Sequence, residues 1–87
     1  MRVHFTEIAW EEFMSWRDDA ETSAKIVALI QEIRRTPFTG TGKPEPLKGP
    51  LSGWWSRRIT REHRLVYAVG GKGPEQRVTI AGCRDHH

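Results

Sequence analysis

Apolar residues in the first part of the chain recur at the spacing of amphipathic helices. A short strand is predicted first, at Arg2–Phe5. Thr6 follows it, and its hydroxyl can accept a hydrogen bond from the unsatisfied amides of a helix start. We therefore predict a helix after Thr6, with an apolar side formed by Trp10, Phe13, Met14 and Trp16.

A second helix is predicted at residues 22–35, where apolar and polar positions form two separate sides. Pro37 ends it, because proline lacks the amide that would continue the helical hydrogen bonds. The apolar stripe consists of Ile26, Val27, Ile30 and Ile33, and Lys25, Gln31, Glu32 and Arg35 are free to face water.

Segment 36–53, "TPFTGTGKPEPLKGPLSG", interrupts the helical pattern with four of the five prolines and four of the eight glycines. This composition predicts a structured loop with little regular hydrogen bonding. Aromatic and β-branched residues then predict strands at 54–60, 64–69 and 77–83. The turns "TREH" and "GGKGPE" separate these strands, so we expect neighbouring strands to pair as antiparallel hairpins.

These elements predict a single α+β domain covering residues 1–87, with two N-terminal helices packed on one face of a small antiparallel-rich sheet. Successive side chains of a strand point to opposite faces. If Ile59 and Leu65 pack on the helices, Arg58 and Arg64 both lie on the open face of the sheet. The pattern thus predicts a wall of fixed positive charge on that face.

Composition limits the class of protein. The chain has 87 residues and a mass of 10.0 kDa, which suits one small domain. No apolar run approaches the roughly 20 residues of a membrane helix, and the N-terminus lacks the apolar core of a signal peptide. A single cysteine, Cys83, cannot form an internal disulfide. We therefore expect a cytoplasmic protein that does not enter a membrane.

Charge is distributed unevenly along the chain. Residues 1–33 contain three basic and seven acidic side chains, whereas residues 34–87 contain eleven basic and four acidic ones. A basic half of this kind is typical of a protein that binds a phosphate backbone, because each neutralised phosphate releases counterions. A merely solvated basic surface is the common alternative in small proteins.

The residue types needed to cleave RNA through its own 2′-hydroxyl are all present. Such a reaction needs a base for the 2′-hydroxyl proton, an acid for the leaving 5′-oxygen and cations for the charge on phosphorus. Glu45 lies in the rigid loop between two prolines, and Lys43 and Lys48 are close to it. His86 and His87 follow the last predicted strand, and an unperturbed histidine side chain has a pKa of about 6.5, which suits a proton donor at neutral pH. The alternative is a solvated loop carboxylate and mobile terminal histidines.

A metal site is the other chemistry that the tail suggests. Cys83, His86 and His87 are nearly contiguous, and only His4 or His63 could complete the ligand set. This spacing does not match that of a zinc site, so we predict no metal and no cofactor.

The segment "RRTPFTGTGKPEPLKGPLSGWWSRRITREHRLVYAV" and the ending "CRDHH" resemble the YoeB/Txe family of the RelE superfamily of bacterial toxins. The runs "GKPEPLK", "LSG", "WSRRI" and "EHRLVY", in this order and spacing, carry the resemblance. It implies a toxin of a type II toxin–antitoxin pair that enters the ribosomal A site and cuts messenger RNA without a metal. It also implies a YefM-like antitoxin, the ribosome and mRNA as partners, and a homodimer.

By matching motif, the resemblance implies a role for each residue of the set. Glu45 corresponds to the general base, Arg64 to the cation that stabilises the phosphorane, and His86 to the general acid. Lys48 and Arg58 match positions that contact phosphate or help orient the site, and we predict that Lys43, Arg57 and His87 also contact RNA. The tail departs from the family, which has tyrosines on both sides of the histidine where this chain has Asp85 and His87.

Three functions follow from these observations. The first is a ribosome-dependent endoribonuclease. The second is a nucleic-acid or ribosome binder without efficient catalysis, which the missing tyrosines would permit. The third is a topoisomerase-inhibiting toxin of the same superfamily, for which Glu45, Arg64 and His86 would have no evident purpose. Cutting of ribosome-bound message separates the first function from the other two.

Overall fold

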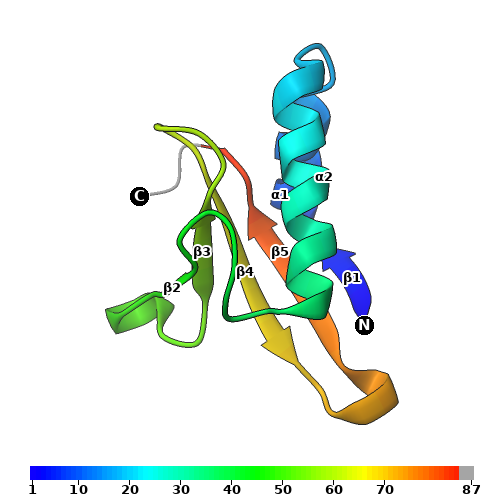
Figure 1. The fold of residues 1–87 in the computed structure, drawn as a ribbon, viewed down its shortest axis with the longest axis vertical. Helices are drawn as coiled ribbons and strands as arrows, with labels where there is room; N and C mark the ends of the chain where they lie inside the picture. Colours follow the sequence, from blue (N-terminus) through cyan, green and yellow to red (C-terminus); the bar gives the residue numbers. More distant parts are fainter. Residues whose placement is uncertain (85–87) are drawn as a thin grey trace.

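The computed structural model describes residues 1–84. In this part of the chain two helices and five strands form an α+β fold, and the helices pack on one face of the sheet, as predicted (Figure 1). The elements in chain order are β1 (Arg2–Phe5), α1 (Glu7–Ser15), α2 (Ala20–Arg35), β2 (Glu45–Pro46), β3 (Trp55–Arg58), β4 (Arg64–Gly70) and β5 (Arg77–Gly82), with short 3₁₀ turns at Gly49–Leu51 and Gly73–Glu75.

Both helices begin at side-chain caps. The Thr6 hydroxyl accepts a hydrogen bond from the Ala9 amide at 3.1 Å, which confirms the predicted start of α1. The second helix begins two residues before the predicted position, because Asp19 and not a later residue caps it. The Asp19 carboxylate accepts from the Thr22 amide at 3.0 Å, and this hydrogen bond holds the pKa of Asp19 below its usual value.

The predicted apolar stripe of α2 needs one correction. Ile26, Ile30 and Ile33 are buried as expected, but Val27 is 44% exposed and Leu29 is buried instead. The reason is the helical periodicity. At 3.6 residues per turn, position 29 lies on the same side of the helix as positions 26, 30 and 33, whereas position 27 lies about 100° away from position 26. The helices cover a core in which Leu65, Tyr67, Val78 and Ile80 come from the sheet and Ala9, Trp16 and the α2 stripe from the helices.

The sheet has the strand order β1-β5-β4-β3-β2 (Figure 1). The hairpin pairings of β3 with β4 and of β4 with β5 are antiparallel, as predicted. The first strand lies beside the last one in parallel, and the two helices carry the chain from β1 at one edge of the sheet to β2 at the other. The Thr6 amide donates to the Ile80 carbonyl at 2.9 Å, so this pairing continues to the helix start.

The proline-rich loop contains a strand that the sequence did not predict. Glu45 and Pro46 form β2 and pair in antiparallel fashion with Ser56 and Trp55 of β3. The Leu47 amide donates to the Trp54 carbonyl at 2.8 Å and extends the pairing by one residue. Proline is compatible with this place because β2 is the edge strand, where one row of amides has no strand to bind.

Trp10 and Trp16 are both helix-packing residues. Trp16 is buried in the core, whereas Trp10 is 50% exposed and contacts Phe5 with ring centroids 5.5 Å apart. Within residues 1–84, neither helix has the length and apolarity that crossing a membrane requires.

Candidate active site

Strand alternation places the predicted catalytic carboxylate and arginine on the same face of the sheet. Glu45 of β2 lies opposite Ser56 of β3, and Ser56 lies opposite Val66 of β4. Residues that pair across strands point to the same face, and Arg64 is two residues from Val66 on β4. The helices cover the other face, where Leu65 and Tyr67 are buried. Glu45, Ser56 and Arg64 are therefore together on the open face.

These side chains line one pocket of about 440 Å³. Glu45 belongs to β2 and Arg64 to β4, so two strand spacings of about 4.8 Å each separate their strands. Ser56, which is almost completely buried, lies on the strand between them. The rest of the lining is apolar and consists of Leu47, Leu51, Val66 and Ala81. An anion in this pocket would have a carboxylate on one side, a guanidinium on the other and little water beneath it.

A bulge in the sheet shapes the floor of this pocket. Val66 pairs with Gly82 and Tyr67 with Ile80, so the register between β4 and β5 skips Ala81. Bulges of this kind redirect side chains and are frequent beside active sites. Here the displaced Ala81 becomes part of the pocket lining.

Lys43, Lys48 and Arg58, three further predicted cations, do not line this pocket. Arg58 lies on β3 directly opposite Arg64 of β4, and its side chain is exposed. Two like charges on neighbouring strands repel each other, which is tolerable where an anion can be bound between them. Lys43 and Lys48 are exposed just before and just after β2. Lys43 and Lys48 thus flank the strand that holds Glu45, and Arg58 and Arg64 form a pair on β3 and β4.

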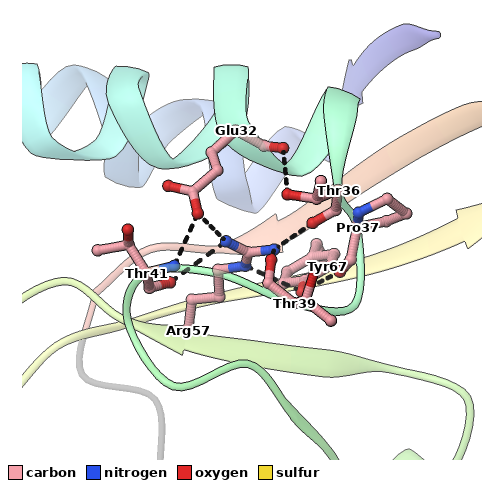
Figure 2. Close-up of polar contacts among 7 residues, drawn as sticks. All are labelled: Glu32, Thr36, Pro37, Thr39, Thr41, Arg57 and Tyr67. Carbon is pink, nitrogen blue, oxygen red and sulfur yellow. Dashed lines mark hydrogen bonds and ion pairs between the residues drawn. The ribbon is translucent and has the colours of Figure 1, made fainter.

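Arg57 does not fit its predicted role as a phosphate contact. It is fully buried, with 0% of its surface exposed, and it points to the helix side of the sheet (Figure 2). Its neighbour Arg58 faces the opposite side, because successive strand residues alternate. The same alternation, applied to the run "WSRRI", already places Arg57 on the side of Trp55 and Ile59. The guanidinium is used inside the protein and is not available to RNA.

Burial of this charge is balanced by a dense set of partners. The guanidinium donates to the carbonyls of Thr36, Thr39 and Thr41 at 2.6, 2.8 and 3.2 Å, and Nε donates to the Tyr67 hydroxyl at 3.2 Å (Figure 2). Nη1 also lies 3.3 Å from the Glu32 carboxylate. Buried charges are stable only when they are paired and hydrogen-bonded in this way.

Glu32 and Tyr67 complete this cluster, and sequence reasoning had assigned neither of them to it. The Glu32 carboxylate accepts from the Thr41 amide at 2.7 Å, and this bond, together with the Arg57 charge, lowers the pKa of Glu32. The Tyr67 hydroxyl donates to the Pro37 carbonyl at 2.7 Å, and burial raises the pKa of Tyr67. Glu32 was expected to face water, and only its tertiary partner explains its orientation.

The last described residues are held against α1. The Cys83 amide donates to the Glu12 carboxylate at 2.8 Å, and the Trp16 indole donates to the Cys83 carbonyl at 3.0 Å. The Arg84 guanidinium lies 4.1 Å from the centre of the Trp16 ring and donates to the Ser15 hydroxyl at 3.0 Å. Burial and, next, the Glu12 charge raise the pKa of the Cys83 thiol to about 12.

The predicted acid and the residue beside it, His86 and His87, lie outside the described residues, as does Asp85. Their roles therefore stay predictions. The anchored pair Cys83–Arg84 comes directly before them in the chain.

Comparison with known proteins identifies relatives along the whole chain. Residues 5–87 match the family described as the YoeB-like toxin of bacterial type II toxin-antitoxin systems. The toxin YoeB of Escherichia coli K12 is 50% identical over 88 aligned residues, and the alignment covers 100% of both chains.

Solved structures give the same result. A YoeB/ParE toxin from Agrobacterium tumefaciens superimposes with a TM-score of 0.95 at 50% identity, with 100% of both chains covered. YoeB of Staphylococcus aureus, solved as a dimer, superimposes with a TM-score of 0.88 at 37% identity, covering 100% of this chain and 98% of the other. A heterotetrameric complex of YoeB and YefM from that organism superimposes with a TM-score of 0.87 at 37% identity and the same coverage.

Proposed function

Since this chain belongs to the YoeB-like toxins of bacterial type II toxin–antitoxin systems, we propose that it is a metal-independent endoribonuclease that cleaves messenger RNA in the ribosomal A site. The observation that supports this proposal best is the pocket on the open face, in which Glu45 and Arg64 lie on opposite sides of a partly apolar floor. The substrate requires the protein to act in the cytoplasm.

In the proposed reaction the RNA provides its own nucleophile. The 2′-oxygen forms a bond to the adjacent phosphorus while Glu45 accepts its proton, and the bond from phosphorus to the next 5′-oxygen breaks. Arg64 stabilises the negative charge that builds on the phosphoryl oxygens. His86 gives a proton to the leaving 5′-oxygen. The products are a 2′,3′-cyclic phosphate and a 5′-hydroxyl end, so no water or metal-bound nucleophile enters the reaction.

We predict that this enzyme cleaves ribosome-bound message well and naked RNA poorly. Glu45 is exposed and the pocket is open at the surface, so the protein alone does not hold a flexible strand in line for attack. Holding the reacting atoms in place supplies much of the rate in such reactions, and the A site can provide it. The measurement is primer extension on translating ribosomes, with protein treated with EDTA and metal-replete ribosomes.

New 5′ ends inside the A-site codon, formed faster than on the same message without ribosomes, are the expected result. Equal cutting of naked and ribosome-bound message would contradict the ribosome requirement. Tight ribosome binding without cutting would instead favour a binder that lacks efficient catalysis.

The exposed cationic face needs a partner that covers it in a living cell. The S. aureus relatives form a dimer and a heterotetrameric YoeB–YefM complex, and we propose that this chain likewise forms a homodimer and binds a YefM-like antitoxin. An acidic segment that folds on binding would match the surface around Arg58 and Arg64.

We predict that the antitoxin protects β3 and β4 from hydrogen exchange and that its affinity falls as salt rises. Both results follow if the contact relies on charges at Arg58 and Arg64 that water can reach. Exchange mass spectrometry with and without antitoxin, at two salt concentrations, is the measurement. Protection confined to the acidic residues of α1 and α2, with no salt effect, would contradict this mode of inhibition.

A further inference from the structure

We propose that Arg57 is a positioning residue for Glu45, which it holds in place through the backbone of the loop between α2 and β2. This inference rests on the proposed function, since it assigns Glu45 the role of the base. Arg57 itself touches neither the pocket nor any exposed surface, because it is fully buried on the opposite side of the sheet (Figure 2).

The first step is the way in which the loop is held. Its carbonyls at Thr36, Thr39 and Thr41 all accept hydrogen bonds from the one guanidinium. The carbonyl of Pro37 accepts from Tyr67, and the amide of Thr41 donates to Glu32. The polar groups of this loop are thus directed toward side chains instead of a regular backbone ladder. The conformation of this loop therefore depends on Arg57, which supplies donors to three of its carbonyls.

The second step concerns the tight path of the loop around this cluster. Gly40 has a φ of +120°, and a Cβ there would collide with the Glu32 carboxylate. Gly42 has a φ of +85°, and a Cβ there would come within 2.9 Å of the Arg58 carbonyl. Both positions require glycine, so the loop passes closer to the Arg57 cluster and to β3 than a chain with side chains at these positions could.

The third step links this loop to the base. The Gly42 carbonyl accepts from the Arg58 amide at 2.7 Å, and Glu45 pairs with Ser56 only three residues later in the chain. Ser56, Arg57 and Arg58 are consecutive on β3. The strand β3 therefore holds both parts. On its helix side Arg57 binds the loop, and on its open side Ser56 pairs with Glu45. A shift of the loop toward or away from β3 would move Glu45 with it.

Removal of the guanidinium would leave the carbonyls of Thr36, Thr39 and Thr41 without this donor in a partly buried place. The Glu32 carboxylate would keep the Thr41 amide and lose the neighbouring positive charge. The loop must then rearrange to reach water. A displacement of about 1 Å at a reacting group can cost about 10² in rate. We therefore expect Arg57→Met, which keeps the length of the stem and removes every donor, to reduce single-turnover cleavage of ribosome-bound message about 10²-fold.

A double-mutant cycle tests whether this loss acts through Glu45. If it does, Arg57→Met added to a Glu45→Gln protein should lower the remaining rate by less than about threefold, because the base is already missing. Equal losses in both backgrounds would overturn the proposal and leave Arg57 with a general structural role. Absence of cutting by the wild-type protein would instead overturn the proposed function, so the two failures are distinguishable.

Two controls separate positioning from contact with RNA and from loss of the fold. Arg58→Met is the matched variant on the open face, and each lost phosphate contact should lower the salt dependence of ribosome binding by about 0.7 in log–log slope. Arg57→Met should leave that slope unchanged, and a lowered slope would overturn the proposal. If Arg57→Met does not fold, Arg57→Lys, which keeps the buried charge, takes its place in the same cycle with the same expected non-additivity.

Discussion

Replacement of Glu45 by glutamine is expected to lower cleavage of ribosome-bound message by about 10²–10⁴-fold, the usual contribution of a general base. Glutamine keeps the size of the side chain and loses the ability to accept the 2′-hydroxyl proton. Glu45 is exposed on the edge strand and lies outside the core, so the fold should not change. Single-turnover cleavage and thermal unfolding, measured on the same preparation, provide the two readouts.

The matched control for this variant is Glu75→Gln. Glu75 is an exposed glutamate in the 3₁₀ turn Gly73–Glu75, away from the pocket, and its replacement should leave cleavage unchanged. A Glu45→Gln protein that cuts at the wild-type rate would show that another group takes the proton, and the assignment of the base would be wrong.

Replacement of Arg64 by alanine is expected to reduce the rate of cleavage by about 10²–10³-fold, or about 2.7–4 kcal/mol of transition-state stabilisation. Arg64 is half-buried at the pocket, where a guanidinium interacts with phosphoryl oxygens more strongly than it would in bulk water. Because charge increases on those oxygens during the reaction, kcat should fall more than ribosome affinity. Steady-state kinetics on ribosome-bound message measures the two effects separately.

Two further variants serve as comparisons for Arg64→Ala, the conservative Arg64→Lys and the control Arg17→Ala. Lysine keeps the charge and loses the planar fork, so its rate should lie between those of arginine and alanine. Arg17 is exposed after α1 and is not one of the residues that line the pocket, and its loss should change neither constant. If Arg64→Ala weakened ribosome binding and left kcat unchanged, Arg64 would be a binding residue and not a stabiliser of the transition state.

The regular elements were predictable because each has a local signal. A hydroxyl before an apolar helical pattern indicated the start of α1, and the turn sequences after Thr60 and Gly70 separated three alternating strands. These signals depend on neighbouring residues, and they need no knowledge of tertiary contacts. The fold class followed from their order, since two helices before a run of strands leave one face of a sheet to be covered.

Features that depend on distant partners were not predictable in this way. The strand β2 exists only because Glu45 and Pro46 meet β3, and two residues carry no periodic signal of their own. The parallel pairing of β1 with β5 joins the two ends of the chain. The burial of Arg57 depends on carbonyls that belong to an irregular loop. In each case the energetic reason lies in another part of the chain.

In the candidate site, too, some features were predictable from local sequence and others depend on distant parts of the chain. Alternation along the strands was enough to place Arg58 and Arg64 on the open face, and the structure confirms that placement. The same alternation indicates that Arg58, and not Arg57, of the run "WSRRI" faces the open side, although both were predicted to contact RNA. The apolar floor from Leu47, Leu51 and Ala81 emerges only when loop, turn and bulge are assembled.

Because Cys83 is buried, its reactivity reports local separation of the C-terminal end of β5 from α1. The thiol is fully buried, burial raises its pKa to about 12, and the backbone groups of Cys83 are bonded to the side chains of Glu12 in α1 and of Trp16 directly after it. A disulfide reagent attacks thiolates, so it can react with this cysteine only after β5 and α1 separate. The rate of thiol labelling in the native protein therefore measures how often the segment that leads into the tail detaches, with no need for an introduced label.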